Sequence, residues 1–328
     1  MTARSRVMAV VALAAAAAVA ATVGVTLLQT HGERTTSTTG AVTKPRAGDP
    51  PLMFDFGVRT DPEARALARA AALYANGHRI EAATIFARYH SLAAQIGAAF
   101  AAWPHGGLDT LKHLVATHAR SALAELHLGW AYYWSGRNAD AVTAWQRAAK
   151  VEPDSPAAVS AEDVLHASTM PRGLPFIVTT LQPPARVTRL SAAQELRALA
   201  RAAARPDANA KILYGIALWN LRRPVSAERQ FLAAAALAPH DPTAQTAAAV
   251  GAFTKDRPVR AFARLGPLTG VFPHAAVVRF HLGVLLLWTR SFAKARTQLE
   301  LAVKDAPGSV FASQAQKLLG ALGGTGTK

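Results

Sequence analysis

The sequence predicts an all-α protein, an α-solenoid of helix–turn–helix repeats preceded by one N-terminal transmembrane helix. Three observations favour this fold class. Alanine, the strongest helix former, occupies 75 of the 328 positions. A spacing of 34 residues recurs along the body of the chain. An apolar run of 22 residues without a charged side chain stands near the N-terminus.

The run at residues 7–28 is long enough to cross a bilayer, because 22 helical residues span about 33 Å at ~1.5 Å each. Arg4 and Arg6 precede it, which favours a cytoplasmic N-terminus and a body outside the cytoplasm. A cleaved secretory signal ending at residues 18–20 is the alternative. We expect a single-pass plasma-membrane anchor over residues 1–30, with the body extracytoplasmic, or secreted if the segment is cleaved.

Residues 31–60 are rich in Thr, Gly and Pro, a composition typical of a flexible linker. Within them, Leu52, Met53, Phe54 and Phe56 form a short apolar cluster. Two roles are open to this cluster: packing on the first helix of the body, or docking on a partner.

The 34-residue spacing is clearest in units that begin at residues 122, 208, 242 and 276. At equivalent offsets, small residues allow close approach of two helices, larger residues fill the space between helix pairs, and proline ends the second helix. The small residues include Gly129, Gly215, Gly283, Ala141, Ala227 and Ala295, the large ones Trp145, Phe231 and Leu299, and the prolines Pro153, Pro239, Pro273 and Pro307.

This pattern resembles the tetratricopeptide repeat (TPR), over roughly residues 61–322 and most strongly over 122–155 and 208–307. N-cap residues before proline at 61, 155 and 241 agree with the helix starts. The predicted organisation is a repeat block over 61–170, a Pro-rich connector over 171–190, a second block with a capping helix over 191–322, and a tail over 323–328. In the connector, residues 176–180 are predicted to be extended.

The resemblance implies that the first helix of each repeat lines a concave groove. The residues expected there, as partner contacts, are Leu126, Trp130, Tyr133, Trp134, Ile216, Trp219, Asn220, Phe280 and Trp288, with His127 and His281 at neighbouring groove positions. Apart from Asn209 and Asn220, these positions lack the Lys, Arg and Asn with which family members grip a peptide carboxylate. We expect an apolar or amphipathic peptide or helix in the groove. Alternatively, the connector or a terminal segment fills it.

A basic face is expected on the convex side, formed by Arg222, Arg223, Lys255, Arg257, Arg260 and Arg264. Such a face would attract anionic lipid, an acidic envelope polymer or an acidic protein. Nucleic acid is not expected if the body lies outside the cytoplasm. In the alternative, the chain is an adaptor on the cytoplasmic side of the membrane, and its basic face binds nucleic acid or anionic lipid of the inner leaflet.

No enzyme, cofactor or metal site is expected. The chain has no cysteine, which excludes disulfides, thiolate metal sites and cysteine nucleophiles. The motifs of zinc peptidases, serine hydrolases and nucleotide-binding loops do not occur. An isolated S-x-x-K at residues 291–294 lacks its partner motifs, and His113 and His118 are not spaced to share one face of a helix. The sequence therefore predicts an anchored extracytoplasmic scaffold for protein–protein interaction.

Overall fold

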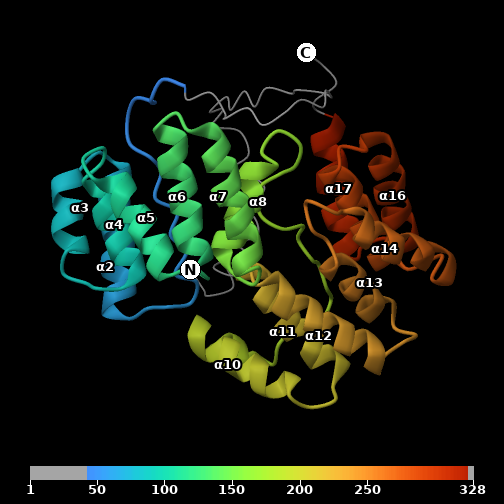
Figure 1. Cartoon of the computed structure of the whole chain (residues 1–328). Helices are drawn as coiled ribbons and strands as arrows, with labels where there is room; N and C mark the ends of the chain where they lie inside the picture. The colour runs from blue at the N-terminus through green and yellow to red at the C-terminus, as the bar shows by residue number, and fades with distance from the viewer. Residues whose placement is uncertain (1–42, 324–328) are drawn as a thin grey trace.

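The computed structural model describes residues 43–323, which form helices joined by turns and extended segments (Figure 1). The predicted transmembrane helix, the first part of the predicted linker and residues 324–328 lie outside this range. From residue 43 to residue 323, no helix is long and apolar enough to cross a membrane. The predicted all-α architecture of helix–turn–helix repeats is confirmed for the described residues.

The helices fall into two blocks on either side of the connector. The N-terminal block contains α2 (Pro62–Ala75), α3 (Arg79–Phe86), α4 (Leu92–Ala101), α5 (Gly107–Thr117), α6 (Ala122–Trp134), α7 (Asn138–Val151) and α8 (Pro156–Leu165). The C-terminal block contains α9 (Ala185–Thr188), α10 (Ala192–Ala203), α11 (Ala208–Asn220), α12 (Pro224–Leu237), α13 (Pro242–Gly251), α14 (Val259–Val271), α15 (Ala276–Trp288), α16 (Phe292–Asp305) and α17 (Val310–Gly323).

Each helix packs on its successor within a block, and alternate helices form a second, inner layer. The next-but-one contacts join α2 to α4, α4 to α6 and α6 to α8, and likewise α11 to α13, α13 to α15 and α15 to α17. These inner helices form one wall of each block, and the side of this wall turned away from the outer helices is termed its concave face. The outer layer consists of α3, α5, α7, α10, α12, α14 and α16.

The residues predicted to allow close helix approach do so. A Cβ on Gly129 would overlap the indole of Trp145, and a Cβ on Gly283 would lie 2.8 Å from Leu299. The indole of Trp145 is buried and donates to the carbonyl of Leu126 at 3.2 Å. The predicted N-caps are also confirmed, because Asp61, Ser155 and Asp241 each accept a main-chain N–H in the first turn of α2, α8 and α13.

Polar contacts join the two blocks. Asp154, just before α8, accepts the main-chain N–H of Ser226 at 2.9 Å and pairs with Arg223 at 3.3 Å, so it caps the start of α12. Farther along α8, Asp163 pairs with Lys255 at 2.5 Å. Both charged groups of this second pair are almost completely buried, which fixes the C-terminal block against α8.

Candidate functional site: two concave faces and their straps

An extended segment crosses the concave face of the N-terminal block. We name it the first strap (residues 43–58). Its apolar side chains Leu52, Phe54 and Phe56 pack against the core of the block. The ring of Phe54 lies 6.3 Å from that of Phe86 and 5.3 Å from the imidazole of His127, between ring centroids. The apolar cluster predicted in the linker therefore packs on the repeats, and residues 43–58 follow a defined path.

The beginning of the first strap is fastened to the end of α6. The main-chain N–H of Arg46 donates to the carbonyl of Trp134 at 2.8 Å, and that of Thr43 donates to Gly136 at 2.9 Å. The guanidinium of Arg46 lies 3.4 Å from the ring centroid of Tyr133 and donates to the carbonyl of the same residue at 2.5 Å. These contacts combine main-chain pairing with a cation–π interaction.

A second extended segment crosses the concave face of the C-terminal block. This second strap (residues 171–184) is most of the predicted connector. Phe176 packs at 5.9 Å from the ring of Phe280, and Leu174, Ile177 and Val178 pack against the same core. Residues 174–179 belong to no helix and pair with no strand of the described chain, and residue 180 lies in a bend.

Two histidines hold the two straps in the same way. In the first strap, the main-chain N–H of Met53 donates to Nε2 of His127 at 3.1 Å. In the second, the N–H of Val178 donates to Nε2 of His281 at 3.0 Å. Each Nδ1 faces the carbonyl four residues earlier, at 2.8 Å in α6 and 2.7 Å in α15. The arrangement requires a neutral imidazole with its proton on Nδ1, so that Nε2 can accept.

The neutral form is also the form that the environment favours. Both imidazoles are almost completely buried. Burial lowers the pKa of each to about 4, and the hydrogen bond to the preceding turn opposes this only in part. His127 and His281 are therefore acceptors for main-chain N–H groups at neutral pH.

A second contact gives the two straps the same register. Three positions before the N–H donor, each strap has a proline whose carbonyl accepts from an aromatic side chain. Tyr74 Oη donates to Pro50 at 2.7 Å, and Trp219 Nε1 donates to Pro175 at 2.6 Å. Tyr74 and Trp219 lie near the ends of α2 and α11, the first inner helix of each block.

The two faces are related by a sequence offset of 154 positions. His-Leu-Gly stands at 127–129 and again at 281–283, and a tryptophan follows at 134 and 288. The helices α6, α7 and α8 begin 154 positions before α15, α16 and α17. Each block therefore presents one groove, its strap and one histidine acceptor.

Among the predicted groove residues, Trp130 and Tyr133 contact the first strap, and Trp219 and Phe280 contact the second. Leu126, Trp219, Phe280 and Trp288 are buried, Trp130, Tyr133, Trp134 and Ile216 are half-buried, and Asn220 is exposed. Trp130 donates from Nε1 to Sδ of Met53 at 3.1 Å and packs edge-on against Trp145. The aromatic side chains thus contact segments of the same chain.

The predicted basic face differs from the expectation in one position and in its charge. Lys255 is 4% exposed and sits between Asp163 and the carbonyl of Pro171, both at 2.5 Å, because it lies in the turn before α14 and points toward the other block. Arg260 and Arg264 share Glu228 at 3.5 and 3.4 Å. Arg257 and Arg223 pair with aspartates, and Arg222 donates to Ser160. Carboxylates therefore neutralise much of this face.

Sequence reasoning placed His127 and His281 in the groove but assigned them no role, and it did not single out Pro50, Pro175 or Tyr74. The repeated His-Leu-Gly was a usable signal, because a histidine at an inner position next to the small glycine is chemically distinctive. Within the described part of the chain, no three His, Asp or Glu side chains gather as a metal ion would require.

No protein-family profile matches the chain, and no curated protein does. Among solved structures, the APC/C hetero-tetramer Cut9–Hcn1 is similar at 15% identity and TM-score 0.32, over 77% of this chain and 55% of that one. This chain thus spans about half the length of that match. The TPR2AB domain of yeast Sti1 in its pHSP90 complex is similar at 14% sequence identity and TM-score 0.30, over 78% of this chain and 96% of that one. The C-terminal part of a TPR repeat-containing protein from Cytophaga hutchinsonii is similar at 13% sequence identity and TM-score 0.28, over 76% of this chain and 98% of that one.

Proposed function

We propose that this chain is a scaffold for protein–protein interaction, whose concave faces hold extended apolar segments of polypeptide. The observation that carries the proposal is the shared register of the straps. In both blocks a histidine accepts a main-chain N–H and an aromatic side chain donates to a prolyl carbonyl three positions earlier. Main-chain pairing with apolar side-chain contacts is a general mode of peptide recognition.

The first strap is the occupant that a partner segment can replace. Within residues 43–323, repeat helices lie on both sides of the second strap in the sequence, whereas they only follow the first strap. Release of the first strap needs a change of backbone conformation at its junction with α2. Residue 57 at this junction is a glycine with φ of 54°, and glycine can adopt a wide range of backbone conformations. A partner segment would then take the same path across α2, α4 and α6.

The partner chemistry follows from the straps. The segment would be extended, would contain a proline three positions before an apolar residue with a free N–H, and would carry an aromatic side chain for the space that Phe54 occupies near Phe86. The aromatic cluster of Trp130, Tyr133 and Trp134 at the end of α6 would contact it. An extended segment suits the site better than a helix, because an intact helix has no free main-chain N–H in its middle.

A peptide added in trans tests the proposal. A fluorescent peptide of residues 47–58 is titrated against the full chain and against a full-length Met53→Asp, Phe54→Asp variant, whose own strap no longer fits the apolar face. We expect at least ten-fold tighter binding to the variant, lost on further substitution His127→Leu. A control peptide with an N-methyl group at Met53 lacks the donor and should bind at least ten-fold more weakly.

The proposal fails if neither peptide binds the variant while its circular dichroism remains that of the wild type. It also fails if the N-methylated peptide binds as well as the unmodified one. Should the double variant lose helix content, the milder pair Arg46→Ala, Asp49→Ala serves instead. It removes the strap's contacts with Tyr133 and Arg79 and leaves the groove intact.

We propose further that the scaffold is anchored in the plasma membrane by residues 7–28 and displayed outside the cytoplasm. The supports are the length of this apolar run and the arginines at positions 4 and 6. Protease added to intact cells lacking their wall, with a tag at each end of the chain, tests the topology. Loss of the C-terminal tag with survival of an N-terminal membrane fragment is expected. Protection of the C-terminal tag would reverse the orientation.

A further inference from the structure

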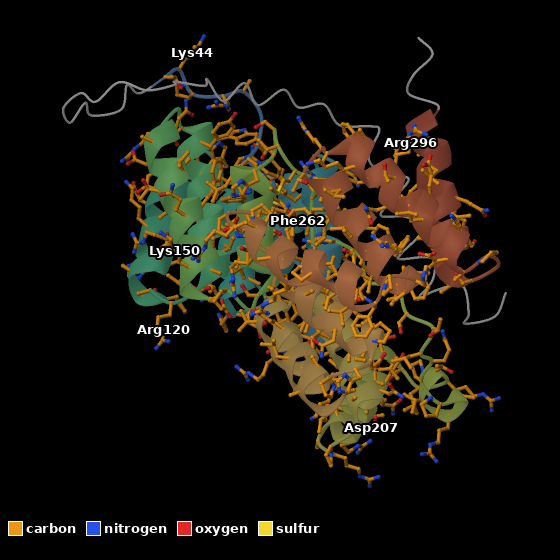
Figure 2. All side chains as sticks on the ribbon, turned by 90° about the vertical axis from the view of Figure 1, so that its right-hand side faces the viewer. Lys44, Arg120, Lys150, Asp207, Phe262 and Arg296 are labelled. Atoms are coloured by element: carbon orange, nitrogen blue, oxygen red, sulfur yellow. The ribbon has the colours of Figure 1, made fainter. Side chains whose placement is uncertain are left out.

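Within the described chain, a group of unpaired arginines lies along α9, α10 and the turns that follow them. Residues 184–211 contain six basic and two acidic side chains. α10 packs mainly on α11, burying Leu199 and Ala203, and its remaining sides face outward. Figure 1 shows α10 projecting below the rest of the molecule, and Figure 2 shows side chains that end in nitrogen around the same lobe.

Five arginines on this lobe are exposed and have no carboxylate within ion-pair distance among residues 43–323. They are Arg186, Arg189, Arg197, Arg201 and Arg205. Of the two acidic residues nearby, Asp207 accepts the N–H of Ala210 at 3.1 Å as the N-cap of α11. Glu195 is half-buried, and burial raises the pKa of its carboxyl. Neither carboxylate forms an ion pair with the five arginines, whereas Glu228 pairs with Arg260 and Arg264 on the convex face.

The spacing of the arginines suits a linear array of anions. Arg197 and Arg201 are four residues apart, so they stand one above the other on α10, about 6 Å apart at ~1.5 Å of rise per residue. Arg205 follows in the turn after α10 ends at Ala203. Guanidinium groups bind phosphate through two parallel hydrogen bonds, which lysine cannot provide.

The surface offers charge but little apolar area. Leu190, which is 39% exposed, is the large apolar side chain that reaches solvent in this segment. The cores of stable protein–protein interfaces are apolar and depleted in charge. A hydrophilic polyanion therefore fits this surface better than a folded protein does.

The position of the lobe disfavours the bilayer that would hold the anchor. Lys44, at the start of the first strap, and Asp207, between α10 and α11, lie at opposite ends of the molecule (Figure 2). A body tethered through its first strap thus presents α10 away from the tether.

We propose that the surface of Arg186, Arg189, Arg197, Arg201 and Arg205 binds a phosphate-bearing polymer of the cell envelope. The location of the polymer rests on the proposed extracytoplasmic anchoring, whereas the binding itself does not. The groove would hold a protein segment at one end of the body while α10 engages the polymer at the other.

The test uses the full chain in nanodiscs of phosphatidylcholine, a neutral lipid, with long-chain inorganic polyphosphate as the probe. Arg197→Gln, Arg201→Gln, Arg205→Gln is compared with Arg257→Gln, Arg260→Gln, Arg264→Gln, which removes the same charge from the α14 side. We expect at least ten-fold weaker binding for the first triple variant and less than three-fold for the second. In a plot of the logarithm of the association constant against the logarithm of the salt concentration, the steepness of the slope should fall by about 2 to 3 relative to the wild type, for the first variant only.

Equal weakening by the two variants would overturn the proposal, because it would reveal a response to net charge alone. Equal binding of polyglutamate would overturn the preference for phosphate. Tighter binding of duplex DNA, or of vesicles containing phosphatidylglycerol, would overturn the assignment to an envelope polymer. None of these outcomes depends on the groove, since the strap residues are unchanged in every variant.

Discussion

His127 in α6 and His281 in α15 occupy equivalent positions 154 residues apart. Each directs Nε2 at a main-chain N–H of an extended segment, Met53 in one block and Val178 in the other, at 3.1 and 3.0 Å. The same side chain thus performs the same task in two separate cores. This equivalence indicates that the concave faces are built to hold main chain, and it makes several properties of the protein testable.

Removing either imidazole should destabilise the fold. His127→Leu leaves the partly buried N–H of Met53 without its acceptor, a loss of about 1–3 kcal/mol. His281→Leu should cost a similar amount, and the double variant their sum, because the two sites lie in separate cores. Urea unfolding of the full chain measures both losses. His105→Leu, at an exposed position, is the control and should change the free energy of unfolding by less than about 0.5 kcal/mol.

Stability should fall as the pH drops from about 6.5 to 4. Burial lowers the pKa of both imidazoles from 6.5 to about 4 in the folded state. The unfolded chain therefore binds more protons in this window, which favours unfolding as the pH decreases. Each imidazole contributes up to about 3 kcal/mol of this loss. To isolate the contribution of the two imidazoles, the free energy of unfolding is measured from pH 7.5 to pH 4 for the wild type and for the double His→Leu variant. The difference between the two should shrink as the pH falls. A difference that stays constant with pH would contradict the neutral-imidazole assignment.

Replacing glycine by alanine should lower the free energy of unfolding where the glycine packs against another helix and raise it where the glycine has open space around it. A methyl group on Gly129 would overlap the buried indole of Trp145, so Gly129→Ala should lower the free energy of unfolding by about 1–3 kcal/mol. Gly270 in α14 has nothing within 4 Å of an added Cβ and is exposed. Gly270→Ala should instead stabilise by about 0.5–1 kcal/mol through helix propensity. Thermal unfolding compares the two, and equal effects would contradict the packing described.

Replacing one partner of the buried Lys255–Asp163 ion pair between the blocks should strongly lower the free energy of unfolding. Lys255→Met leaves the carboxylate of Asp163, 6% exposed, with the N–H of Gly173 but without a cation. A loss of about 3–5 kcal/mol is expected. Adding Asp163→Asn should recover part of this loss, whereas Arg257→Gln at an exposed pair should cost no more than about 1 kcal/mol. A double-mutant cycle with no coupling between Lys255 and Asp163 would refute this role.

The repeats could be predicted from the sequence because they depend on local and periodic signals. Gly129, Trp145 and Pro153 recur at fixed offsets, and N-cap residues mark helix starts at 61, 155 and 241. The predicted second block begins at residue 191, and Ser191 forms the capping box at the start of α10.

The straps could be predicted only in part. The extended run at 176–180 was visible from its β-branched residues, but its seat on α15 depends on contacts more than one hundred positions apart, such as Val178 with His281. Residues 43–58 have the composition of a linker, and their order comes from Tyr74, Arg79 and His127. Lys255 was expected at the surface because helix phase alone could not show Asp163 opposite it.

The most direct test of the central claim is hydrogen exchange of the strap amides, measured by NMR on the full chain at neutral pH. The amide of Met53 should exchange at least one hundred-fold more slowly than in an unstructured peptide. His127→Leu should restore fast exchange at Met53 while Val178 stays protected by His281. Exchange of Met53 at the unprotected rate in the wild-type chain would contradict the claim that the concave face holds this segment through its main chain.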